Sequence, residues 1–155
     1  MRRTAYHEAG HAVVKYILHG RCGDLSISAD GSGFCGGCGV PFRSPSDAVK
    51  VCLAGYAAEM MSAGEDLAME ILILSIPMVK DFSEALEIIK NDPVTKFFAG
   101  EGQVFILNWM SVQVELKQWW AGVEALAERL LVAMQVSDSE AKYILASSEA
   151  KAGGR

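Results

Sequence analysis

The chain contains 155 residues, 51% of them hydrophobic and 21% charged, a composition typical of a globular protein with a hydrophobic core. The net charge of −5 and the lack of basic clusters exclude an electrostatic case for nucleic-acid binding. We expect a single domain over residues 1–150 and a disordered tail at 151–155.

Nothing in the sequence predicts secretion or a membrane span. No apolar signal segment precedes His7. The most apolar run, residues 67–79, is too short to cross a bilayer and contains Glu70 and Pro77, so a buried helix explains it better. We expect a soluble, cytoplasmic protein.

The first predicted element is a helix over residues 4–19, which Gly20 ends. Its apolar residues recur at the spacing of a buried helix face: Ala5, Ala9, Ala12, Val13, Tyr16 and Ile17. Within residues 24–42, Leu25 and Ile27 alternate with serines and glycines follow, which predicts a β-hairpin.

Helices dominate the rest of the chain. The next one starts with Ser44 as N-cap, Pro45 and Asp47 in its first turn, and ends at Gly64. A helix is expected over 65–75, and Pro77 breaks it. Two more helices, over 81–91 and 137–150, start with capping boxes at Asp81/Glu84 and Ser137/Glu140. Between these two, one long helix is expected over 104–136. The fold class is therefore mainly α with one small β-hairpin or sheet.

The segment YHEAGH at residues 6–11 carries the clearest chemical signal. On a helix, His7 and His11 lie one turn apart on the same face, so both imidazoles can hold one zinc ion. Glu8 projects about 100° around the helix axis, within reach of a water beside the metal, and can act as general base. The alternative is an ordinary helix that carries two histidines by chance.

A catalytic zinc ion normally takes three protein ligands. The metzincin continuation is absent, because Val14 and Ile17 stand where its glycine and third histidine would be. The third ligand must come from elsewhere in the chain, and acidic residues are the candidates.

Three segments in order, TAYHEAGHAVV, LAGYAAEMM and KDFSEAL, resemble the peptidase domain of the FtsH-type membrane-anchored AAA+ zinc proteases. The ending WWAGVEALAERLLVAMQVSDSEAKYIL is similar to the last two helices of that family. The resemblance covers nearly the whole chain. It implies a helical peptidase fold with the HExxH helix at the N-terminus and Zn²⁺ as the cofactor.

The resemblance also implies a ligand set, in which two histidines and an aspartate from a later helix hold the zinc. These residues carry over to His7 and His11, with Glu8 as the base. Asp81 fits the aspartate, since Ala85 follows it four residues on as in the family. Asp66 is the alternative, but it follows the AGYAAE segment too closely.

Two further roles follow from the same resemblance. Glu59 matches an acidic residue near the metal helix and can accept the other N–H of a ligand histidine, although a surface glutamate is an equal reading. The strand of Leu25, Ser26 and Ile27 can act as an edge to which a substrate peptide adds as a further strand.

Four cysteines are present: Cys22, Cys35, Cys38 and Cys52. Four-ligand zinc sites usually show two CxxC pairs, whereas only Cys35 and Cys38 form one here. A thioredoxin-like motif follows a strand and opens a helix, whereas this pair lies among glycines. We expect reduced thiols in a hairpin loop.

The chain departs from the family in one large respect. No GxxxxGK[ST] segment occurs, so we expect no ATP site in this chain. We also expect no transmembrane helix before the domain. Whether the protein forms a homo-oligomer or binds a separate partner protein stays open.

Three functional hypotheses remain. The first is a zinc endopeptidase that cuts unfolded or flexible polypeptides. The second is a catalytically silent zinc-containing binding or adaptor protein that uses the apolar stretch 97–110. The third is a cysteine-centred metal or redox protein. We favour the enzyme because His7, Glu8, His11 and Asp81 are all present.

Overall fold

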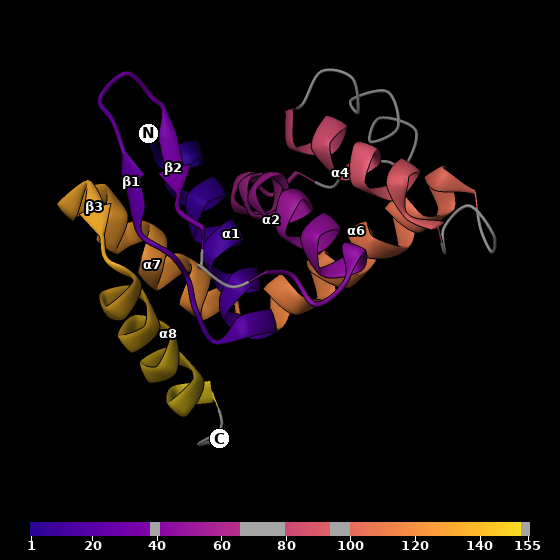
Figure 1. Ribbon diagram of the computed structural model, residues 1–155. Coiled ribbons are helices and arrows are strands. Elements are labelled where there is room, and N and C mark those ends of the chain that lie inside the picture. Colours follow the sequence, from indigo (N-terminus) through magenta and orange to yellow (C-terminus); the bar gives the residue numbers. More distant parts are fainter. Residues whose placement is uncertain (38–40, 66–79, 94–99, 153–155) are drawn as a thin grey trace.

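Helices surround a central helix pair, and a small antiparallel sheet lies at one side (Figure 1). The computed structural model describes residues 1–37, 41–65, 80–93 and 100–152. The helices are α1 (Arg2–His19), α2 (Pro45–Ala63), α4 (Lys80–Asn91), α6 (Glu101–Gln118), α7 (Trp120–Ala133) and α8 (Asp138–Ala152), and the strands are β1 (Leu25–Ile27), β2 (Gly33–Cys35) and β3 (Gln135–Val136). The predicted class, mainly α with a small sheet, is confirmed.

The central pair consists of α1 and α2, which pack along each other. The predicted face of α1 is buried, with Ala5, Ala9, Ala12 and Val13 fully enclosed. The helices approach closely at Gly10, where a Cβ would lie 2.6 Å from the Cβ of Ala58 and would overlap the Ala54 carbonyl oxygen. Gly10 therefore lets the backbones of α1 and α2 touch, which brings their side chains into one site.

The ends of α1 and α2 follow the predicted signals. Gly20 has a φ of 68° and donates its N–H to the Tyr16 carbonyl, which ends α1. The Ser44 hydroxyl accepts the Asp47 N–H at 3.1 Å, so Ser44 is the N-cap of α2. These two caps fix where the chain leaves α1 and enters α2.

The sheet has the order β2-β1-β3, with both neighbours antiparallel to β1. The predicted hairpin is confirmed, since Ser26 pairs with Phe34 across β1 and β2. The expectation that Leu25, Ser26 and Ile27 form an open edge is wrong, because β3 occupies the other side of β1. Among the strands that the structure describes, β2 is the one beside α1 with an open edge.

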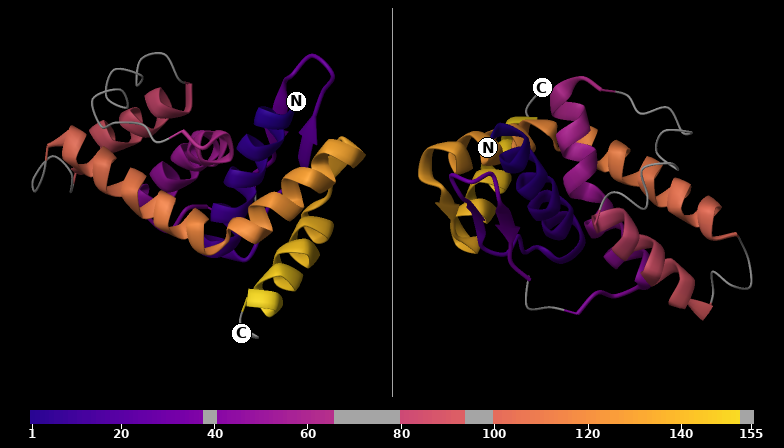
Figure 2. Two further views of the ribbon diagram at one scale, coloured as in Figure 1. Left: turned by 180° about the vertical axis from the view of Figure 1, so that it is seen from behind. Right: turned by 90° about the horizontal axis from the view of Figure 1, so that it is seen from above.

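The single helix predicted over 104–136 is also wrong. α6 ends at Gln118, and α7 begins at Trp120 and runs at an angle to it (Figure 2). The bend lets α6 pack on α2 while α7 packs on α1. Met134, with a φ of 63°, then ends α7, and the next two residues pair with β1 as β3.

The two predicted capping boxes are incomplete. The Ser137 hydroxyl accepts the Glu140 N–H at 3.3 Å, but the Glu140 carboxylate accepts from Arg129 Nε at 2.6 Å instead of closing the box. α4 begins at Lys80, so Asp81 lies inside its first turn and does not cap it. The Asp81 carboxylate lies beside His7 and His11 instead.

Several expectations fall on residues that the structure does not describe. These are the helix over 65–75 beyond Glu65, the tail from 153, and Cys38 and Asp66. α8 continues to Ala152, two residues into the predicted tail. Among the described helices, none combines the length and the apolar character that crossing a membrane would require.

Candidate metal centre

Two histidines of α1 and an aspartate of α4 meet beside α2. His7 and His11 place their Nε2 atoms 3.1 Å apart. Asp81 Oδ2 lies 3.0 Å from Nε2 of His7 and 3.5 Å from Nε2 of His11. The three side chains could hold a metal ion, because each offers one ligand atom to a common point.

The spacing of these three atoms fits a metal ion. In a tetrahedral zinc site with bonds of about 2.05 Å, neighbouring ligand atoms lie about 3.3 Å apart. The observed separations of 3.0, 3.1 and 3.5 Å bracket that value. Within the described part of the chain, the buried Oδ2 of Asp81 accepts no hydrogen bond of normal geometry. A cation between the three groups would satisfy that oxygen.

The second nitrogen of each histidine has its own partner. His11 Nδ1 lies 2.7 Å from the Val51 carbonyl oxygen, and His7 Nδ1 lies 3.3 Å from Glu59 Oε2. Arg3 in turn donates Nε to Glu59 Oε1 at 2.8 Å. When Nδ1 carries the hydrogen of such a bond, Nε2 presents its lone pair, so both rings are oriented for metal binding through Nε2.

The charges around His7 favour a cation at this point. Burial acts to lower the pKa of His7, but the carboxylates of Asp81 and Glu59 outweigh it and raise the pKa to about 9. Burial acts to raise the pKa of Asp81, but the two imidazoles beside it hold that pKa well below its usual range. The bond from His7 likewise lowers the pKa of Glu59. Protonated His7 can donate its Nδ1–H toward Glu59 and its Nε2–H toward Asp81, and a metal ion at Nε2 can take the place of the second of these protons.

Glu8 lies next to the ligands without being one of them. It is buried, with 6% of its surface exposed, and lines the same cleft as His7, His11 and Asp81. Burial raises its pKa, and the charges of the two histidines offset part of that effect. A Cβ on Gly33 would overlap Oε1 of Glu8, so this carboxylate lies directly against β2.

The cleft has a volume of about 570 Å³, and β2 forms one of its walls. The Gly36 N–H bonds the Asp24 carbonyl, and the Ser28 N–H bonds the Ser32 carbonyl. In this antiparallel pattern alternate residues bond to the partner strand, so Gly33 and Cys35 turn their backbone N–H and C=O away from β1. The N–H and C=O of Gly33 therefore lie on the open edge that the sequence placed on β1, while the Cys35 carbonyl accepts a hydrogen bond from Lys15 Nζ.

Lys15 connects this edge of β2 to α1, the helix that carries His7 and His11. Lys15 is buried and lies one turn beyond His11 on α1. Its Nζ donates to the carbonyls of Gly36 at 2.9 Å and Cys35 at 3.2 Å. The position of β2 relative to the histidines is therefore set by two charge-assisted hydrogen bonds.

The cysteines take no part in a metal-binding group among the described residues. Cys22 and Cys52 are free thiols, as expected, and burial raises the pKa of each to about 12. A thiol with such a pKa stays protonated at neutral pH and is a poor metal ligand. Cys35 lies on β2, where Lys15 Nζ is 3.2 Å from its sulfur.

Gly55 on α2 lies against the two histidines of the candidate metal centre. A Cβ there would lie 2.6 Å from Nε2 of His7 and would overlap Nε2 of His11. Sequence reasoning missed Gly55, Lys15 and the Val51 carbonyl. The local signal that could have identified Gly55 is its position inside the helix that follows Ser44, because a glycine within a helix often marks a close approach of another group.

No protein-family model matches this chain, and no curated protein matches it in sequence. The indications of function therefore come from the chemistry of the candidate metal centre and the cleft.

Proposed function

We propose that the protein is a zinc-dependent endopeptidase that hydrolyses peptide bonds in unfolded or flexible polypeptides. The observation that carries this proposal is the meeting of His7, His11 and Asp81 at tetrahedral spacing, with buried Glu8 in the same cleft. Two imidazoles and one carboxylate are a common ligand set of catalytic zinc. The resemblance to the FtsH-type peptidase domain supports the same roles.

A zinc ion bound by these residues supplies Lewis acidity, which lowers the pKa of a neighbouring water and polarises a carbonyl oxygen. Glu8 accepts the proton of the attacking water and passes it to the nitrogen of the leaving amine. Burial raises the pKa of Glu8, which favours its uptake of that proton. Glu59 and the Val51 carbonyl keep the histidine rings oriented.

The substrate binds as an extended strand along β2. Gly33 presents its N–H and C=O to the cleft side, beside Glu8, and a peptide can pair with them. A chain must be extended to do this, which restricts the substrate to unfolded or flexible segments. Since no ATP-binding motif occurs in this chain, hydrolysis here is independent of ATP.

Metal analysis and casein cleavage test this proposal. The purified protein is expected to hold one zinc ion per chain and to cleave casein in a reaction that a chelator stops. Glu8→Gln should retain the zinc but lose activity by a factor of about 10² to 10⁴, the contribution of a positioned general base. Glu124→Gln, an exposed position on α7, is the charge-matched control and should remain active. Iron in place of zinc, or undiminished cleavage by Glu8→Gln, would contradict the proposal.

A second candidate is a catalytically silent zinc-containing adaptor. Leu107, Met110 and Val114 lie on one face of α6 and are each more than half exposed, which is unusual for large apolar side chains. Phe105 and Trp109 from the apolar stretch 97–110 are buried in the core. The exposed apolar surface of α6 is therefore smaller than that stretch of sequence suggested. Cleavage that depends on Glu8 would exclude this candidate.

A further inference from the structure

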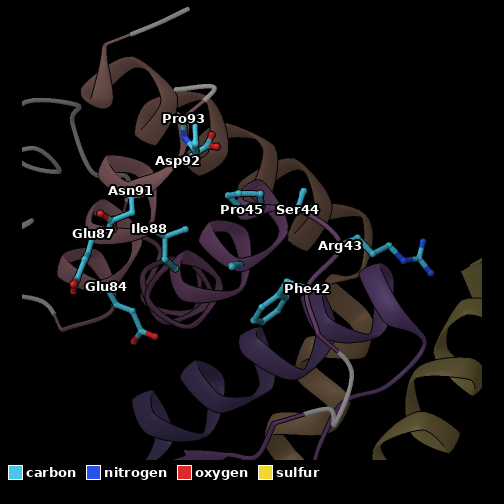
Figure 3. A pocket seen from close by; sticks show the side chains of 11 residues that line it. Phe42, Arg43, Ser44, Pro45, Glu84, Glu87, Ile88, Asn91, Asp92 and Pro93 are labelled. Carbon is cyan, nitrogen blue, oxygen red and sulfur yellow. The ribbon is translucent and has the colours of Figure 1, made fainter. Parts of the chain in front are cut away.

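A second cavity continues from the metal cleft and has no part in the hydrolysis described above. Its volume is about 670 Å³, and it lies between the start of α2 and the exposed face of α4 (Figure 3). Phe42, Ala48, Glu84 and Ile88 line both this cavity and the metal cleft. A polypeptide held at the metal centre can therefore place a side chain in it.

The walls of the cavity are apolar. Phe42 stands on one side and Ile88 on the other, and Pro45 lies beside them (Figure 3). Phe42 is 43% exposed as a residue, so it offers apolar surface that a bound side chain can cover. An aliphatic stem between Phe42 and Ile88 would be removed from water, which favours binding of long side chains.

The rim of the cavity is acidic. Glu84 and Glu87 stand three residues apart on α4, so they lie on the same face of that helix, and both are exposed. Among the described residues that line the cavity, Arg43 is the one cation, and Figure 3 shows its guanidinium directed away from α4. The rim therefore attracts positive charge and repels negative charge.

We propose that this cavity binds a lysine or arginine side chain of the polypeptide substrate, close to the scissile bond. The aliphatic stem lies between Phe42 and Ile88, and the cationic end lies at Glu84 and Glu87. Lysine and arginine combine a long apolar stem with a terminal charge, as the walls and rim together require. The inference rests on the proposed function, because it takes the polypeptide held at the metal centre as the ligand.

Binding measurements separate the subsite from catalysis. Zinc-loaded Glu8→Gln protein is titrated into fluorescein-labelled peptides in which a single lysine, leucine or glutamate is moved through successive positions. At one position, fluorescence anisotropy should show the lysine peptide binding about tenfold more tightly than the leucine peptide, with the glutamate peptide weakest. Higher salt should reduce this preference, since both carboxylates are exposed.

The variants assign the preference to the rim. Replacing both Glu84 and Glu87 by glutamine in the same protein should bring the lysine-to-leucine ratio close to one. Glu124→Gln, which removes the same charge from the surface of α7, should leave the ratio unchanged. Circular dichroism melting of each variant verifies that it is folded. A lysine preference that survives the double substitution, or its absence at every position, would overturn the subsite.

Cleavage of the same peptides by the unsubstituted protein distinguishes the two proposals. If the peptides are cleaved without any preference for a basic residue, the endopeptidase stands and the subsite fails. If no peptide is cleaved but the lysine preference and its dependence on Glu84 and Glu87 persist, the subsite stands and the enzymatic function fails. If no peptide binds at all, the subsite is refuted.

Discussion

Replacing Gly55 by alanine should weaken metal binding at least about 100-fold while leaving the protein folded. The added Cβ would lie 2.6 Å from Nε2 of His7 and closer still to Nε2 of His11. Unbonded carbon and nitrogen atoms prefer separations of about 3.5 Å, so the imidazoles must retreat by nearly 1 Å. Metal–ligand distances tolerate deviations of only about 0.2 Å, so the ligand set can no longer converge.

The expected loss of zinc affinity is much larger than the expected loss of folding stability. Outer-shell substitutions at metal sites typically lower affinity by about 10- to 100-fold, and a direct clash with two ligands should reach at least the upper value. Overpacking destabilises a protein by about 1–3 kcal/mol, whereas alanine in a helix gains about 1 kcal/mol over glycine. The net loss of about 0–2 kcal/mol is small against the usual 5–15 kcal/mol of folding stability.

Competition with a chromophoric chelator measures the zinc affinity, and thermal unfolding in EDTA measures the stability of the metal-free fold. Gly102→Ala is the matched control, because Gly102 also lies in a helix but its Cβ would meet no atom within 4 Å. The control should bind zinc normally. Unchanged zinc affinity in Gly55→Ala would refute the geometry in which both Nε2 atoms face α2.

Three further predictions follow from the same site. Asp81→Ala should weaken zinc binding at least 100-fold in the chelator assay, and an unchanged affinity and stoichiometry would remove it from the ligand set. Because its pKa is raised from 6.5 to about 9, protonated His7 stabilises the metal-free fold below pH 6.5, by at most about 3 kcal/mol, and this contribution disappears as the pH rises through 9. Equal stabilities in urea at pH 6 and pH 9.5 would contradict this assignment. Lys15→Met should leave zinc affinity unchanged but weaken binding of an extended peptide to zinc-loaded Glu8→Gln protein about tenfold, because the end of β2 loses its two hydrogen bonds. Normal peptide binding would show that Lys15 does not position β2.

The predictable part of the site is local in sequence. His7, Glu8 and His11 lie within two turns of one helix, so helical geometry alone places the two histidines together. Asp81 comes from a helix about 70 residues later, and only the resemblance to a family selected it over Asp66. The assignment of Asp81 as a ligand stays a prediction, whereas its position beside the histidines is now a structural fact.

The failures have a common physical cause in tertiary contacts. Trp119 and Met134 carry no helix-ending signal, yet α6 is separated from α7 at Trp119 and α7 ends at Met134. The separation lets α6 pack on α2 and α7 pack on α1. Gln135 and Val136 then pair with β1, which moves the open edge of the sheet to β2. The open edge could not be assigned from residues 24–42 alone, because the strand that covers the other side lies more than 90 residues later.

One helix, α1, sets the relation between the proposed base, the candidate metal ligands and the strand edge proposed for the substrate. At 100° per residue, Thr4, Glu8 and Lys15 lie within about 40° of one another around α1. All three face the hairpin: Thr4 donates to the Gly31 carbonyl at 2.9 Å, Glu8 adjoins Gly33, and Lys15 bonds the end of β2. His7 and His11 occupy the adjacent sector toward α2 and α4. Glu8 therefore lies between the candidate metal ligands and the strand edge, which is where the proposed hydrolysis requires a base. α1 also buries its opposite face in the core, and this packing fixes the helix that carries all five of these residues.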